Sequence, residues 1–225
     1  MTSQTSCNDA DAGYFVAQTG QLVQSACSPG TYQPATGQSS CLSADAGYFV
    51  QTSGSTAQTQ CVVGTYQPIT GRTSCNQASP GHYVDQTGQS SQTACLIGTF
   101  NPNYGSVSSA DCVNANPGHY VDQPGQASET PCTSGTYNPS FGASSISSCI
   151  DSEPGYFVSL SGQSSQSICG LGTYQPSTGQ TSCLDASPGY FVDNFGQSMQ
   201  IECGLGTYQP LSGPSSCTDA SEGRY

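Results

Sequence analysis

The sequence predicts a small disulfide-rich, all-β tandem-repeat fold: an elongated stack of short hairpins whose 34–37-residue repeats each consist of two halves of 17–20 residues. Thirteen cysteines alternate at spacings of 20 and 14 residues, the latter stretched twice to 17. Every complete half contains a Gly, an aromatic residue two positions later, and a second Gly seven positions after the first. Short β-branched and aromatic segments lie between Gly and Pro, without helical periodicity. We expect each half to contact only its neighbours.

The repeats follow one another along the whole chain. We place the tail of a truncated repeat at 1–7, repeats at 8–41, 42–75, 76–112 (long), 113–149 (long), 150–183 and 184–217, and the start of a truncated repeat at 218–225. Because both ends interrupt a repeat, we expect a segment of a longer array. The alternative is a mature chain with a free or intermolecular cysteine.

Two kinds of half alternate within these repeats. The cysteine half is typified by residues 27–41, which read Cys-Ser-Pro-Gly-Thr-Tyr-Gln-Pro-Ala-Thr-Gly-Gln-Ser-Ser-Cys, and the cysteine-free half by residues 44–58. Thr-Tyr or Tyr-Phe-Val after the first Gly predicts a short strand, and the Pro that follows in the cysteine half ends pairing because it has no N–H. The long halves carry three extra residues before their closing Cys, at 95–112 and 132–149, where we expect a longer hairpin loop.

The cysteine-free halves indicate which cysteines are bonded. Where a cysteine half has Cys at both ends, a cysteine-free half has Ala or Ser at one and Gln or Glu at the other, as in Ala44 and Gln58, so both cysteines disappear together. This paired replacement predicts disulfides Cys27–Cys41, Cys61–Cys75, Cys95–Cys112, Cys132–Cys149, Cys169–Cys183 and Cys203–Cys217. Pairing across the 20-residue intervals, beginning with Cys7–Cys27, is the alternative that the sequence leaves open. In the first scheme Cys7 is unpaired, or is bonded outside this sequence.

The motif of the cysteine half, Cys-x-x-Gly-Thr-Tyr-x-Pro-x-x-Gly-x-x-Ser-Cys, resembles the ephrin-receptor-like and tumour-necrosis-factor-receptor-like cysteine-rich modules. In those modules the Cys before Gly-x-Tyr bonds the Cys that ends the same hairpin unit. The alternation of Asp-Ala-Gly-Tyr-Phe-Val with Gly-Thr-Tyr-Gln-Pro also looks like repeats in very long surface proteins of aquatic archaea and bacteria. The resemblance implies an extracellular array without enzymatic activity.

Composition and motifs argue against several other functions. His82 and His119 occupy a slot that is Tyr in other repeats, so we expect neither to be catalytic. The acidic residues lack the spacing of a calcium-binding loop, the cysteines lack a closed zinc-ligand set, and we expect no metal or cofactor. A net charge of −12 with two basic residues disfavours nucleic acid. No run of about 18 apolar residues exists to span a membrane.

The surface is expected to be rich in hydroxyl groups. Ser and Thr supply 59 of 225 residues, whereas charged residues make up 7% of the chain. Asn138-Pro139-Ser140 is excluded as an N-glycosylation sequon by its proline. Ser and Thr beside Pro and Gly are compatible with O-linked glycans as partners, although hydroxyl-rich repeats without sugar are equally consistent.

The favoured function is structural: a segment of an extracellular or cell-surface stalk, adhesin shaft or filament, in which identical chains self-associate through the repeated aromatic residues. Disulfides require oxidising surroundings, which agrees with this location. The alternative is a receptor-like or adhesin ectodomain that binds a protein or glycan. Its candidate contact residues are Tyr104 and Phe141, the extra aromatics of the two long halves.

Overall fold

The computed structural model describes residues 7–221, and these residues form twelve two-stranded antiparallel hairpins in tandem. The strands pair as β1 (Tyr14–Phe15) with β2 (Ser25–Ala26), β3 (Thr31–Tyr32) with β4 (Leu42–Ser43), β5 (Tyr48–Phe49) with β6 (Thr59–Gln60), β7 (Thr65–Tyr66) with β8 (Asn76–Gln77), β9 (His82–Tyr83) with β10 (Thr93–Ala94), β11 (Thr99–Phe100) with β12 (Val113–Asn114), β13 (His119–Tyr120) with β14 (Thr130–Pro131), β15 (Thr136–Tyr137) with β16 (Ile150–Asp151), β17 (Tyr156–Phe157) with β18 (Ser167–Ile168), β19 (Thr173–Tyr174) with β20 (Leu184–Asp185), β21 (Tyr190–Phe191) with β22 (Ile201–Glu202), and β23 (Thr207–Tyr208) with β24 (Thr218–Asp219). The predicted disulfide-rich all-β tandem repeat is confirmed.

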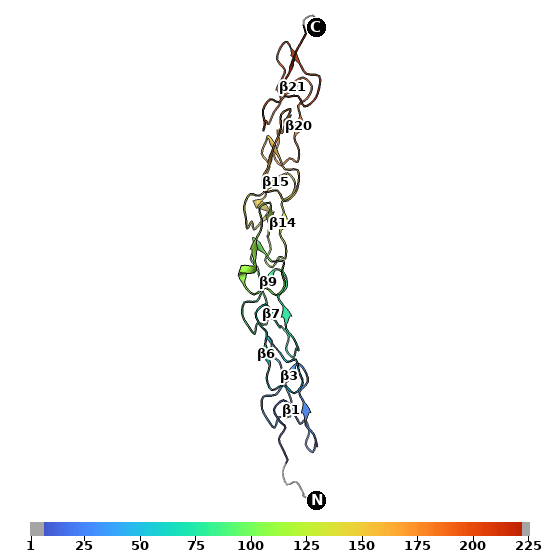
Figure 1. The fold of residues 1–225 in the computed structure, drawn as a ribbon, viewed down its shortest axis with the longest axis vertical. Helices are drawn as coiled ribbons and strands as arrows, with labels where there is room; N and C mark the ends of the chain where they lie inside the picture. The colour runs from blue at the N-terminus through green and yellow to red at the C-terminus, as the bar shows by residue number, and fades with distance from the viewer. Residues whose placement is uncertain (1–6, 222–225) are drawn as a thin grey trace. The chain divides into compact units, whose positions relative to one another are not determined.

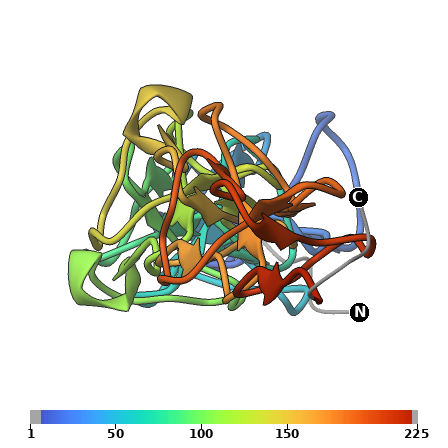
Figure 2. The same ribbon diagram turned by 90° about the horizontal axis from the view of Figure 1, so that it is seen from above.

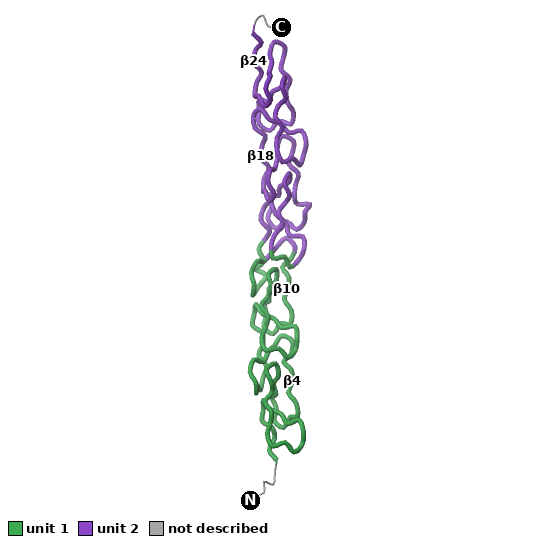
Figure 3. Tube along the Cα trace, turned by 90° about the vertical axis from the view of Figure 1, so that its right-hand side faces the viewer, with its two compact units in different colours: residues 1–96, 101–113, 125–127 green, residues 97–100, 114–124, 128–225 purple. Residues whose placement is uncertain are grey.

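The chain divides into two compact units (Figure 3). The first comprises residues up to 96 together with 101–113 and 125–127, and the second comprises 97–100, 114–124 and the residues from 128 onward. Within each unit the hairpins succeed one another in sequence order (Figure 1). The truncated repeats predicted at 1–7 and 218–225 lie mainly or partly outside the described residues, as does Tyr225, the last residue of the aromatic series.

Each hairpin begins with a tight turn that the sequence encodes directly. In the turn of residues 28–31, the Thr31 amide donates to the Ser28 carbonyl oxygen at 2.9 Å, and Gly30 has a φ of +87°. A turn with positive φ at its third residue is of type II, which favours Pro at the second position and Gly at the third. Pro29 and Gly30 supply both, and the β-branched Thr31 and aromatic Tyr32 then enter the strand.

The core is a column of small buried side chains. Each of the ten hairpins from β3–β4 to β21–β22 contributes two positions to it: its first residue, and the residue that follows the aromatic. In the hairpin β5–β6 these are Ala44 and Val50, and in β7–β8 they are Cys61 and Gln67. The aromatics themselves, such as Phe49 and Tyr66, are half-buried. The repeated aromatic residues, through which we expect self-association, are therefore only partly available to another chain in most hairpins, because packing within the chain covers part of each ring.

Adjacent hairpins are joined by backbone hydrogen bonds. Between β5–β6 and β7–β8, the Gly47 amide donates to the Gln67 carbonyl at 2.7 Å, the Val50 amide to the Arg72 carbonyl at 3.0 Å, and the Gly71 amide to the Ala44 carbonyl at 2.7 Å. The same set recurs along the array, so backbone groups that end the short strands are satisfied by the next hairpin.

The stack also joins each hairpin to the next but one. A Cβ atom on Gly47, whose φ is +86°, would overlap the carbonyl oxygen of Gly88, two hairpins further along. The same close approach joins Gly64 to Gly105. The expectation that each half contacts only its neighbours is therefore wrong, because the loop of a hairpin also lies against the turn of the hairpin two positions earlier. Gly is required at this contact since no side chain fits.

The three extra residues of the long halves form short 3₁₀ helices. These are η1 (Ser109–Asp111) and η2 (Ile146–Ser148), and each lies at the outer edge of its unit (Figure 2). Ser108 caps η1 by accepting from the Ala110 amide, and the Asp111 carboxylate accepts from the Ser108 amide at 3.1 Å. The lengthened loop of β11–β12 is thus ordered by a capping box, which the hairpin-loop prediction did not anticipate, whereas Ser145 at the start of η2 makes no such side-chain bond.

Candidate functional site

Six hairpins are closed at their base by a disulfide. Within residues 7–221 the bonds are Cys27–Cys41, Cys61–Cys75, Cys95–Cys112, Cys132–Cys149, Cys169–Cys183 and Cys203–Cys217. These are the six pairs predicted from paired replacement, and the pairing across 20-residue intervals does not occur among them. We call these the disulfide hairpins: β3–β4, β7–β8, β11–β12, β15–β16, β19–β20 and β23–β24.

The disulfide lies between the stack and its surface. In the hairpin β7–β8 the opening Cys61 is fully buried, while the closing Cys75 is half-buried, and their Cα atoms are 5.8 Å apart. This separation falls in the ordinary range for a protein disulfide. One sulfur therefore fills the core column, and the other joins it to the second strand.

The other six hairpins are closed by a side-chain clasp at the same place. In the hairpin β5–β6, the Gln58 Oε1 accepts from the Asp45 backbone amide at 2.6 Å, and the Gln58 Nε2 donates to the Asp45 Oδ2 at 2.6 Å. Gln58 stands where a disulfide hairpin has its closing Cys, and Asp45 follows Ala44, which stands where the opening Cys would be. We call these the clasp hairpins: β1–β2, β5–β6, β9–β10, β13–β14, β17–β18 and β21–β22.

The backbone half of the clasp is present in every clasp hairpin. The amide donors and side-chain acceptors are Asp11 with Gln24, Asp45 with Gln58, Ser79 with Gln92, Asn116 with Glu129, Glu153 with Gln166, and Ser187 with Gln200, at 2.6–2.7 Å. In β13–β14 the amide and carboxylate are exchanged, so that the Asn116 Nδ2 donates to the Glu129 Oε1 at 2.9 Å. The sequence analysis identified the Gln and Glu positions as replacing the closing Cys, but it assigned them no role and did not single out the residues whose amides they bind.

A second side chain orders the loop of the disulfide hairpins. Gln67 is buried in β7–β8, where its Nε2 donates to the Ser74 carbonyl at 2.7 Å and its Oε1 accepts from the Ile69 amide at 3.1 Å. In the long hairpin β11–β12, Asn101 takes this place and donates to the Ser106 hydroxyl at 2.7 Å. The shorter amide thus occurs where the loop is longer. The Gln-Pro and Asn-Pro dipeptides were the available sequence signal.

The predicted contact residues lie at the surface. Tyr104 is 70% exposed in the first unit, and Phe141 is 68% exposed in the second. Each immediately precedes the second Gly of its hairpin. Phe195 occupies the same slot in the clasp hairpin β21–β22 and is 62% exposed. The sequence interpretation missed Phe195 because it considered only the two long halves.

The two histidines are half-buried and pack against neighbouring hairpins of the stack. In the first unit, the half-buried His82 ring packs beside Gly125, and its Nδ1 lies 3.1 Å from the Pro80 carbonyl oxygen. In the second unit, His119 packs beside Gly162, with its Nδ1 3.8 Å from the Glu129 Oε1. Among residues 7–221 no group of three or more His, Cys, Asp or Glu is placed to hold a metal ion.

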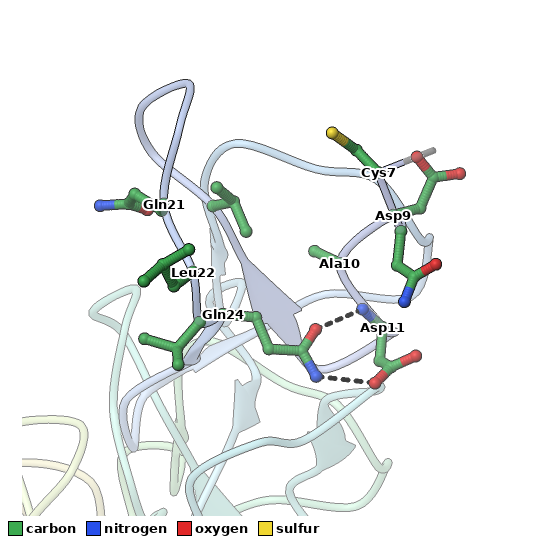
Figure 4. Close-up of a pocket in the computed structure, with 10 residues that line it drawn as sticks. Cys7, Asp9, Ala10, Asp11, Gln21, Leu22 and Gln24 are labelled. Carbon is green, nitrogen blue, oxygen red and sulfur yellow. Dashed lines mark hydrogen bonds between the residues drawn. The ribbon is translucent and has the colours of Figure 1, made fainter. Parts of the chain in front are cut away.

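Cys7 is exposed and unbonded beside an open hollow of about 740 Å³ in the first unit. Cys7 and Asp9 line one side of this hollow, and Gln21 and Leu22 line the other (Figure 4). Gln24 and Asp11 form the clasp of β1–β2 at its floor (Figure 4). The lining therefore combines one thiol and two carboxylates with aliphatic side chains.

Two comparisons complete the description of these sites. No protein-family model matches this chain, and no curated protein matches it either. Within the described residues, no helix has the length and apolar character needed to cross a bilayer.

Proposed function

We propose that this chain is a structural extracellular protein: a segment of a cell-surface stalk, adhesin shaft or filament, with no enzymatic activity. The single observation that carries this proposal is that all twelve hairpins of residues 7–221 are closed at their base, by a disulfide or by a clasp. A shaft needs every unit to be fixed, whereas a catalytic domain needs a small set of unique side chains.

The disulfides support a location outside the cytoplasm. Six bonds in 225 residues require an oxidising compartment, and units this small have cores too limited to be stable without cross-links or neighbours. The many Ser and Thr residues of the loops can carry O-linked glycans, which would suit a hydrated surface structure.

Small-angle scattering of the oxidised full-length chain tests the shaft proposal. A compact protein of 225 residues has a radius of gyration of about 17 Å. A shaft predicts a value at least twice as large, together with rod-like decay of the scattering at intermediate angles. A radius near the compact value would overturn the proposal.

Self-association into a filament is the further part of this proposal. Repeated identical surfaces allow the same contact to recur between chains, and contacts that do not close extend into fibres. Electron microscopy of native material should show filaments of uniform width. Sedimentation of a single monomeric species at high concentration, with no fibres in native material, would contradict it.

A receptor-like or adhesin ectodomain is the second candidate. The observation that favours it is the exposure of Tyr104 and Phe141, because these aromatic side chains depart from the repeat and offer the kind of contact area on which binding sites rely. Binding of a protein or glycan that is lost in Tyr104→Thr and Phe141→Thr variants would support it. Thr is the residue found at this slot in short disulfide hairpins such as β7–β8.

A further inference from the structure

The clasp hairpins β17–β18 and β21–β22 meet at a place where large apolar side chains are exposed on both of them. The Ile168 side chain packs on the backbone of Gly196, with its Cδ1 3.1 Å from the position that a Cβ would occupy there. Phe195 directly precedes Gly196. Ile168 and Phe195 are 47% and 62% exposed, so packing against Gly196 leaves both available to solvent.

We call the contact between the second strand of a clasp hairpin and the loop of the next clasp hairpin a seam. Ile168 and Phe195 occur together at one seam of the stack. Where other clasp hairpins meet in the same way, Ile168 is replaced by Gln60, Ala94 or Pro131. In those seams Phe195 is replaced by Thr87, Pro124 and Ser161, respectively. Leu160, Met199 and Ile201 are also exposed on the same two hairpins. Single exposed apolar residues are normal on protein surfaces, but a local concentration of them indicates an interaction site.

The charge around this seam limits what can cover it. Exposed carboxylates accompany the apolar residues: Asp193 lies two residues before Phe195, and Glu202 follows Ile201 in β22. Residues 128–221 contain seven Asp and Glu and no Lys, Arg or His. A second copy of residues 128–221 has no basic side chain to pair with Asp193 or Glu202, so charge favours a basic partner at this place.

We propose that Ile168 and Phe195 form the centre of a docking site for a basic amphipathic segment of another protein. Its apolar side chains would cover Ile168 and Phe195, and its Lys or Arg residues would meet Asp193 and Glu202. A cation beside the exposed Phe195 ring also gains from the negative face of the ring. Such a site is independent of a shaft role, so its absence would leave that role untouched.

Fluorescence anisotropy with the oxidised full-length chain tests the site. The probe is a labelled 12-residue peptide of alternating Arg and Leu, compared with peptides of alternating Arg and Ser and of alternating Glu and Leu. We expect the Arg–Leu peptide to bind at least about tenfold more tightly than either comparison peptide, because both apolar burial and charge pairing are needed. Equal binding of the Arg–Leu and Arg–Ser peptides, or no binding of the Arg–Leu peptide, would overturn the proposal.

Variants that restore residues found elsewhere in the array locate the site. Ile168→Gln with Phe195→Ser should weaken binding of the Arg–Leu peptide at least about tenfold. Asp193→Ser with Glu202→Gln should weaken it less and reduce its dependence on salt. The matched control is Leu22→Thr with Val23→Ala, which removes exposed apolar side chains from the first unit and should leave binding unchanged.

Two outcomes with these variants would overturn the site. One is that the Ile168/Phe195 variant binds as well as the parent chain, or that the Leu22/Val23 control loses as much affinity. The other is that the parent chain self-associates in sedimentation experiments and the Ile168/Phe195 variant does not, which would identify a second copy as the occupant. Circular dichroism of each variant confirms that its fold is retained.

Discussion

The disulfide hairpins and the clasp hairpins are closed at the same place, the base of the hairpin, but by different chemistry. In β7–β8 a covalent bond joins Cys61 to Cys75, whereas in β5–β6 Gln58 makes two hydrogen bonds to Asp45 across the same base. Closing a loop of about 15 residues covalently contributes about 3 kcal/mol by the chain-entropy model. Hydrogen bonds at an exposed site contribute about 1 kcal/mol each. The two kinds of hairpin therefore have similar geometry and unequal stability.

Because the two kinds of hairpin alternate, disulfide hairpins can stabilise the clasp hairpins beside them. Each clasp hairpin in the interior of the array is followed by a disulfide hairpin, to which backbone hydrogen bonds join it. A clasp hairpin that frayed would have to break those bonds as well as its clasp. We therefore expect its stability to depend on its covalently closed neighbours, as in other linear repeat arrays.

Complete reduction should have the largest effect. Six closures together contribute more than the 5–15 kcal/mol by which a typical domain is stable, so the reduced chain should unfold even though its clasps are chemically intact. Circular dichroism with and without dithiothreitol measures this. The oxidised chain under moderate heating is the control and should stay folded. A reduced chain with an unchanged spectrum would show that clasps and core suffice.

Gly47→Ala should destabilise the chain next most strongly, by about 4 kcal/mol, because the new Cβ meets the Gly88 carbonyl oxygen at positive φ. Gly64→Ala, in a disulfide hairpin, should cost a similar amount, because both kinds of hairpin make this contact between a turn Gly and the loop two hairpins further along. Gly20→Ala is the control: its φ is +81° but nothing lies within 4 Å of its Cβ, so only about 1 kcal/mol is expected. Urea unfolding gives the free energy of unfolding of all three variants. Equal losses in Gly47→Ala and Gly20→Ala would contradict a role for the close contact of Gly47 with Gly88.

Converting one kind of hairpin into the other should have an intermediate effect. Cys61→Ala with Cys75→Ala should lower the free energy of unfolding by about 3 kcal/mol. Cys61→Ala, Val62→Asp and Cys75→Gln together copy the clasp of Ala44, Asp45 and Gln58, and should recover about 1–2 kcal/mol of that loss. The comparison is made by urea unfolding. A converted hairpin no more stable than the double-alanine variant would show that the clasp does not close a hairpin.

The clasp itself should show the smallest effect. Gln58→Ala should cost about 1–2 kcal/mol because it removes two hydrogen bonds. Gln58→Glu should also destabilise, since it places a carboxylate against Asp45. Adding Asp45→Asn should restore stability by reproducing the Asn116 and Glu129 arrangement. Thermal unfolding of the parent chain, Gln58→Glu, Asp45→Asn and the double variant gives the coupling energy, and simple additivity would contradict a direct contact.

Sequence reasoning predicted the parts of the fold that depend on local chemistry. Gly and Pro mark the turns, Thr31 and Tyr32 mark the strand, and the joint loss of two cysteines identifies each disulfide, whereas the turn type came from the structure. These features depend on residues close in the chain or on the repeat itself. For the same reason, Tyr104 and Phe141 could be singled out as departures from the repeat.

The remaining features depend on how the hairpins are rotated against one another. The overlap of Gly47 with the loop of Gly88 requires the geometry of the stack, which the repeat length alone does not specify. The bond from Gln58 to the Asp45 amide requires the two strands to meet at a particular register. The contact of Ile168 with Gly196, the residue after Phe195, arises only when hairpins two apart come together.

Peptide mapping of the unreduced protein tests the alternation of covalent and hydrogen-bonded closure most directly. Proteolysis without reduction, followed by mass spectrometry, should link Cys61 to Cys75 and Cys95 to Cys112, and should find no bond that spans a clasp hairpin. A link between Cys41 and Cys61 would span the hairpin β5–β6. It would contradict both the disulfide hairpins and the clasp that replaces them.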